Sequence, residues 1–187
     1  MTLPSLTIIS TVLVASEFLL AVSKRSGSGG GGKDRCTLPL LWLVIGVSVW
    51  LGFELRARFP AGRFPHPLAC YLTGLVLFVL GLIIRWTAII HLGRFFTVNV
   101  AIAEGHQLIM TGPYRFVRHP SYTGTLFIFL GFGLCTLNFF AMAAILIPIS
   151  AAFVWRIHVE ETALRENFGD RYRDYAARTR RVIPLVW

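Results

Sequence analysis

The segment GPYRFVRHPSYTGTLFIFLGFG, residues 112–133, places three ionisable side chains directly before a long apolar run. These side chains are Arg115, Arg118 and His119. Ionisable groups at a hydrocarbon boundary are costly, and they are a functional-site hypothesis by default. The residues after Pro120 are almost all apolar, as in a helix that crosses a bilayer. The segment therefore predicts the start of a membrane helix with a polar cluster at its entrance.

Apolar runs of this kind recur along the whole chain of 187 residues. Hydrophobic residues make up 55% of the chain and charged residues only 14%, whereas soluble domains are about a quarter charged. We expect five spans, each near the ~20 residues that cross a bilayer. They cover about 4–22, 36–53, 67–92, 121–137 and 139–157. The predicted fold class is an all-α integral membrane protein with five transmembrane helices.

The formal net charge of +9 is distributed unevenly over the loops. Fourteen Lys and Arg residues fall in 23–35, 93–119 and the segment from 156 onward, against three in 54–66. The positive-inside rule then places the N-terminus outside and the C-terminus in the cytoplasm. Basic residues that face anionic lipid explain the charge more simply than nucleic acid does. We therefore expect a multi-pass membrane protein with membrane lipids, and no nucleic acid, as partners.

Two parts of the chain are distinguished by composition. Residues 1–35 hold the first apolar run and a Gly/Ser linker, SKRSGSGGGGKDR, which predicts a loose tether. Residues 36–187 form the main membrane domain, and its chemically interesting motifs fall in 94–187. After Trp155 the segment RIHVEETALRENFGDRYRDYAARTRR mixes both charge signs with apolar residues at roughly helical spacing. We expect a C-terminal cytoplasmic interfacial helix, broken near Gly169, whose apolar face returns to the bundle.

Two polar clusters face the same predicted cytoplasmic boundary. Arg156 and Glu160 are four residues apart and share a helix face, with Glu161 beside them. A basic and aromatic rim can simply mark a helix end, and an Arg–Glu pair can brace one. His119 has no second ligand at metal-binding spacing, so we expect no metal site. The other cluster contains Asn99, His106, Tyr114, Arg118, His119 and Tyr122.

Two motifs in these clusters carry a family resemblance. GHQLIMTGPYRFVRHPSYTG, residues 105–124, is followed by EETALRENFGDRYRDYAARTRRVIPLVW, residues 160–187. Together they resemble the isoprenylcysteine carboxyl methyltransferase family, whose relatives include the phospholipid methyltransferases. The upstream LGRFFTVNV, residues 92–100, is similar to the bacterial members. The resemblance implies S-adenosylmethionine in a cytoplasmic pocket closed by the C-terminal segment, and a lipophilic substrate that enters from the bilayer.

The resemblance also implies roles for individual residues. Arg156 would hold the substrate carboxylate, with help from Arg118. The implied cofactor-binding residues are Asn99, His106, Gln107, Leu108, Ile109, Tyr114, His119, Pro120, Ser121, Tyr122, Glu160 and Glu161.

The expected chemistry agrees with these roles. The sulfonium cofactor carries an activated methyl group, so no metal is required. A carboxylate with a pKa near ~3–4 is already ionised at neutral pH, so no general base is required either. The site must orient the carboxylate and exclude water, and a guanidinium orients it through forked hydrogen bonds.

Three other functions stay open at this point. A phospholipid N-methyltransferase would use the same cofactor on an amine, which favours acidic or aromatic surroundings over an arginine. A non-catalytic lipid-binding membrane protein would use the polar boundary as a head-group patch. A membrane sterol reductase with a nicotinamide cofactor would have a similar late polar boundary.

Overall fold

The computed structural model describes residues 3–23, 37–96 and 108–183, and the regular elements in this part of the chain are all helices. The α-helices are α1 (Leu6–Ser23), α2 (Thr37–Arg58), α3 (Pro67–Leu92), α4 (Pro120–Cys135), α5 (Phe139–Phe168) and α6 (Asp170–Arg178). Short 3-10 turns lie at η1 (Pro60–Gly62), η2 (Gly93–Phe95) and η3 (Gly112–Arg115). The predicted all-α class is confirmed for these residues.

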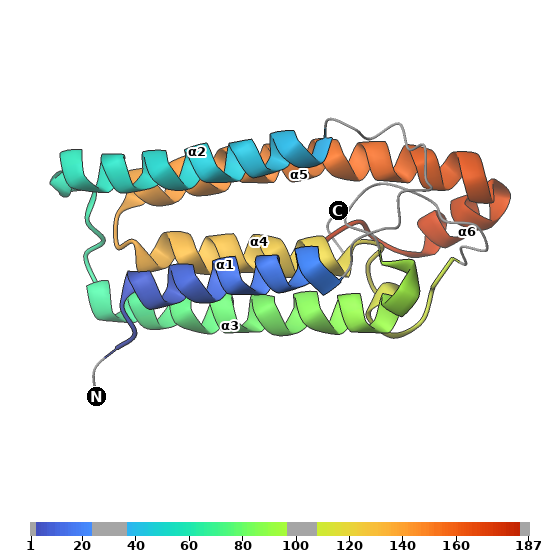
Figure 1. The fold of residues 1–187 in the computed structure, drawn as a ribbon, viewed down its shortest axis with the longest axis horizontal. Coiled ribbons are helices and arrows are strands. Elements are labelled where there is room, and N and C mark those ends of the chain that lie inside the picture. Colours follow the sequence, from blue (N-terminus) through green and yellow to red (C-terminus); the bar gives the residue numbers. More distant parts are fainter. Residues whose placement is uncertain (1–2, 24–36, 97–107, 184–187) are drawn as a thin grey trace.

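The long helices run side by side, with α6 at one end of the bundle (Figure 1). Helix α3 packs against α4, α2 packs against α5, and α4 joins the two pairs through α5. Phe78, Phe132 and Ile145 are buried where these helices meet. Large apolar side chains also lie exposed on the outer faces, such as Trp50 and Ile147. Exposure of this apolar surface to water is unfavourable, whereas exposure to lipid chains is not.

Each predicted apolar run coincides with a helix. Three of the helices in the described residues, α2, α3 and α5, are long and apolar enough to cross a membrane. The apolar helices α1 and α4 are shorter than the usual spanning length. The chain is therefore a multi-pass membrane protein by the character of its helices.

Helices α3 and α4 cross closely through glycines spaced seven residues apart on each helix. A Cβ atom at Gly74 would lie 2.7 Å from the carbonyl oxygen of Gly131, and one at Gly81 would lie 2.6 Å from that of Gly124. Small residues let membrane helices approach to backbone contact. This crossing sets the first turn of α4, where the R-H-P motif ends, against the C-terminal half of α3.

The end of α5 differs from the sequence prediction. The fifth run was expected to end near residue 157, with a separate helix after it. The structure has one continuous helix to Phe168, followed by Gly169 with φ of 53° and then α6. Glycine adopts this left-handed conformation at little cost, so the chain can reverse there. Arg156, Glu160 and Glu161 consequently lie on the same rigid helix as the apolar part of α5.

Candidate functional site

The turn η3 connects the loop before α4 to both α3 and α6. The Tyr114 hydroxyl donates to the carbonyl oxygen of Ala88 at 3.3 Å, and the Tyr114 carbonyl accepts from the Tyr175 hydroxyl at 2.6 Å. Burial raises the pKa of Tyr175 to about 12, so this hydroxyl stays a donor at neutral pH. These two bonds hold α6 over the entrance to α4.

The segment after α6 pairs with the R-H-P motif through the main chain. The Arg118 amide donates to the carbonyl of Arg180 at 2.7 Å, and the His119 amide donates to that of Arg181 at 2.9 Å. A helix that starts at Pro120 leaves its preceding amides without intrahelical partners. Here the C-terminal segment supplies them. The two motifs of the resemblance are thus joined by backbone hydrogen bonds.

Glu161 is the buried charged residue at the contact between the C-terminal segment and the start of α4. Its side chain is only 2% exposed, and Arg118 Nε donates to Oε1 at 2.9 Å. Its other oxygen, Oε2, accepts from Arg181 Nε at 3.1 Å and from Arg165 at 3.2 Å. His119 Nε2 lies 3.5 Å from Oε1. One buried carboxylate therefore joins the start of α4, the helix α5 and the C-terminal segment.

Arg118 binds main-chain carbonyls as well as Glu161. The sequence prediction gave it a part in holding the substrate carboxylate. Its guanidinium donates to the carbonyl of Ala176 at 2.9 Å and also to that of Thr179. The sequence did not predict these bonds of Arg118 to main-chain carbonyls, and it did not predict Arg165 and Arg181 as partners of Glu161. The four-residue spacing of Glu161 and Arg165 on one helix was the available signal.

Tyr122 connects the two predicted polar clusters. Its hydroxyl donates to Glu160 Oε2 at 2.8 Å and accepts from Arg156 Nε at 3.0 Å. Its ring stacks on that of His119, with centroids 5.6 Å apart, and contacts Phe153 on α5 at 5.3 Å. Arg156 is buried, whereas the Glu160 side chain is 31% exposed. Tyr122 and Glu160, both among the implied cofactor-binding residues, are thus in direct contact.

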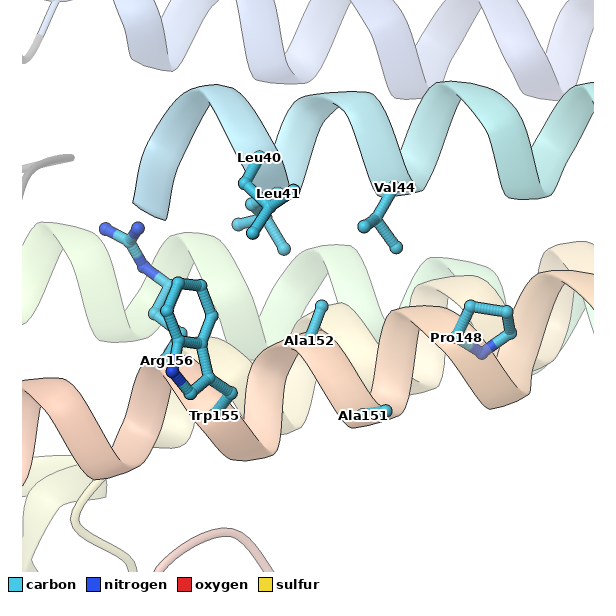
Figure 2. Close-up of a pocket in the computed structure, with 8 residues that line it drawn as sticks. All are labelled: Leu40, Leu41, Val44, Pro148, Ala151, Ala152, Trp155 and Arg156. Carbon is cyan, nitrogen blue, oxygen red and sulfur yellow. The ribbon is translucent and has the colours of Figure 1, made fainter. Parts of the chain in front are cut away.

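A cavity of about 390 Å³ lies beside this network, between α2 and α5. Figure 2 shows Arg156 at its end, next to the first turns of α2. Arg156 is the charged residue among those that line the cavity, and the lining surface itself is apolar. The other lining residues are Leu40, Leu41, Val44, Pro148, Ala151, Ala152 and Trp155.

The remaining predicted residues fall into two groups. Leu108 is buried against Tyr172 and Tyr175, and Ile109 follows it half-buried. Pro120 and Ser121 are buried in the first turn of α4. Asn99, His106 and Gln107 lie outside the described residues.

Comparison with known proteins agrees with these motifs. Residues 74–166 match the isoprenylcysteine carboxyl methyltransferase (ICMT) family. Protein-S-isoprenylcysteine O-methyltransferase B of Arabidopsis thaliana is 37% identical over 115 residues, which cover 60% of this chain and 58% of that protein. The Tribolium castaneum O-methyltransferase is 30% identical over 148 residues, or 78% of this chain and 52% of that protein. The chain therefore spans less than two thirds of the length of these relatives.

The fold is also similar to a solved structure. The eukaryotic intramembrane Ras methyltransferase ICMT superposes with a TM-score of 0.74 at 28% identity, and the match covers 97% of this chain and 65% of that chain. The matched segment, the named relatives and the shared fold lead to the same conclusion: the chain belongs to the isoprenylcysteine carboxyl methyltransferase family.

Proposed function

We propose that this protein transfers a methyl group from S-adenosylmethionine to the carboxylate of a lipophilic, isoprenylcysteine-like substrate at the cytoplasmic membrane face. The observation that carries the proposal is the Tyr122 hydroxyl, which links Arg156 to Glu160 at the end of an apolar cavity. Membership of the family supports the reaction class.

The cofactor side of the proposed site is built on Glu160, Tyr122 and His119. When bound, S-adenosylmethionine supplies an activated methyl group on a sulfonium centre. The residues present suit such a cation. Glu160 is acidic and partly exposed, so its carboxylate can accept from the ammonium or the ribose hydroxyls. The stacked rings of His119 and Tyr122 offer a flat surface beside it.

The substrate side is built on Arg156. Its Nε donates to Tyr122, which fixes the direction of the guanidinium plane. A carboxylate at the end of the cavity would be held by forked hydrogen bonds, while the lipid chain lies along the apolar walls. Arg156 and Glu160 are joined through the Tyr122 hydroxyl by two hydrogen bonds. The groups that would bind the nucleophile and the methyl donor therefore lie next to each other.

Arg118 and Glu161 have a supporting part in this proposal. They bind the C-terminal segment and not the reacting groups, and they keep water out by closing α6 over the site. Leu108, Tyr114 and Tyr175 complete the closure from the side of η3. The predicted contacts of Asn99, His106 and Gln107 with the cofactor remain part of the proposal.

We further propose that all five helices α1–α5 cross the membrane. Helix α1 has 18 residues, at the short end of the spanning range of ~17–25, and α4 has 16 residues, just below that range. The distribution of Lys and Arg supports an outside N-terminus and a cytoplasmic site. Under this topology α6 lies at the inner interface, with Tyr172 and Tyr175 turned inward.

The test is methyl transfer from labelled S-adenosylmethionine. Purified protein is incubated with an S-prenylated N-acylcysteine in vesicles, and the lipid product is then treated with base. We expect volatile methanol, the mark of a methyl ester, and its loss in Arg156→Ala. Glu160→Ala should lose cofactor binding measured by calorimetry. Arg173→Ala is the matched control, because Arg173 lies exposed on α6 with Asp170 as its partner.

Three outcomes would contradict the proposal. Base-stable label in phospholipid would indicate N-methylation. Absence of transfer to any lipid would indicate a binding protein or a reductase. Normal activity of Arg156→Ala would refute the assigned part of that residue.

A further inference from the structure

A charged pair connects α1 to α3 at membrane depth. Arg85 donates to Glu17 Oε2 at 2.9 Å, and the two side chains are 11% and 17% exposed. At the neighbouring positions Trp86 Nε1 donates to Ser16 Oγ at 2.9 Å. The Gly/Ser linker predicts a loose tether for α1, yet its side chains make specific polar bonds. Ionisable residues are rare in such helices and mark functional positions.

The network continues from Arg85 into the first turns of α4. The same guanidinium donates to Ser121 Oγ at 3.2 Å and to Thr125 Oγ1. Thr125 in turn donates to the main-chain carbonyl of Ser121 at 2.9 Å. A guanidinium can only donate, so Ser121 Oγ accepts this bond and its own hydrogen can be directed to another acceptor. The orientation of the Ser121 hydroxyl is thereby set from α3.

We propose that Glu17 is a positioning residue for the S-adenosylmethionine site, acting through Arg85 on Ser121. The proposal rests on the function proposed above, with Ser121 as one of the cofactor-binding residues that the family resemblance implies. Without its carboxylate partner, Arg85 at this depth would turn to other acceptors and would carry Ser121 with it. Glu17 lies outside the segment that matches the family model, residues 74–166.

The test compares Glu17→Gln with Ser16→Ala in the full-length protein. Glu17→Gln removes the charge partner of Arg85, whereas Ser16→Ala removes the adjacent bond between α1 and α3 and leaves Arg85 untouched. We expect Glu17→Gln to raise the Kd for S-adenosylmethionine about tenfold, as for coupled members of one hydrogen-bond network. The KM for the cofactor should rise while kcat at saturation changes little. Ser16→Ala should bind as wild type, and Glu17→Asp should recover most of the affinity.

A double-mutant cycle with Ser121→Ala then separates positioning from mere docking of α1. If Glu17 acts through Ser121, Glu17→Gln adds no further loss of affinity to Ser121→Ala. Full additivity would overturn the proposal, and so would equal effects of Glu17→Gln and Ser16→Ala or wild-type affinity in Glu17→Gln. Should Glu17→Gln not fold, the uncharged Glu17→Met, which also removes the carboxylate partner of Arg85, carries the same cycle. If the wild-type protein binds no S-adenosylmethionine, both this proposal and the proposed function are overturned. If the wild-type protein transfers methyl groups and Glu17→Gln binds S-adenosylmethionine with wild-type affinity, only the proposal on Glu17 is overturned.

Discussion

Glu160 and Glu161 are adjacent carboxylates on α5, and the structure predicts opposite consequences for their neutralisation. Glu161 lies inside the closure with Arg118, Arg181 and Arg165, whereas Glu160 meets Tyr122 at the partly open side of the network. Glu161→Gln keeps the shape of the side chain and removes its charge. The guanidinium groups around it then lose their shared acceptor in a buried place.

The size of the effect follows from burial. Removing one partner of a buried ion pair costs about 3–5 kcal/mol because the other charge stays desolvated. Arg118 and Arg181 carry this cost, with side chains 9% and 24% exposed. Arg165 is 51% exposed and contributes little, since solvent screens it. For a protein of this size about 2–4 °C of Tm is lost per kcal/mol, so we expect a fall of about 6–20 °C.

The assay is thermal unfolding in detergent combined with limited trypsin digestion. In Glu161→Gln the Tm should fall, and cleavage at Arg178 and Arg180 should become faster because the C-terminal segment is released. Glu160→Gln is the matched control, with near wild-type Tm and cleavage but weak binding of S-adenosylmethionine. A Glu161→Gln protein with wild-type Tm and an intact C-terminal segment would refute the reasoning.

Three further substitutions test other parts of the structure. Tyr122→Phe keeps the ring contacts but removes the hydroxyl that joins Arg156 to Glu160. A hydrogen bond to a charged group contributes about 1.5–3 kcal/mol, so kcat/KM should fall at least about tenfold. An unchanged kcat/KM would argue against the network. Gly124→Ala would place a Cβ 2.6 Å from the backbone of α3 and should cost about 1–3 kcal/mol in unfolding experiments, whereas Gly46→Ala, with open space around it, should be tolerated. Burial raises the pKa of Tyr175 to about 12, so its contribution to stability is full below the ordinary value of about 10 and is lost as the pH rises through about 12. The stability difference between wild type and Tyr175→Phe, followed by unfolding against pH, should therefore shrink in that interval, and a constant difference would contradict it.

The helices and the central contact could be predicted from sequence because the signals are local. Apolar runs mark the helices, and the spacing of Arg156 and Glu160 places them on one face. The two motifs of one family placed Tyr122 and Glu160 together among the implied cofactor-binding residues. The structure adds the hydroxyl as the link between the two charges.

The rest depends on tertiary contacts that no local pattern carries. The family resemblance implied that Arg118 helps Arg156 to hold the substrate carboxylate. The structure gives it acceptors 43 and 58 residues away, at Glu161 and Ala176. Arg85 lies inside a predicted apolar run, and the structure gives it Glu17 as its partner, 68 residues before it. A charged side chain takes the acceptor that the fold brings to it, and sequence spacing does not indicate which one that is.

The main-chain pairing of His119 with Arg181 also has a consequence for biosynthesis. At about 5–20 residues per second, the ribosome needs several seconds to add the residues that separate the two. During that interval the amides at the start of α4 and the Arg118 guanidinium lack the acceptors that the C-terminal segment supplies. A nascent chain therefore cannot close its C-terminal segment over the start of α4 until Arg180 and Arg181 have emerged from the ribosome, and chains truncated before these residues should lack this closure.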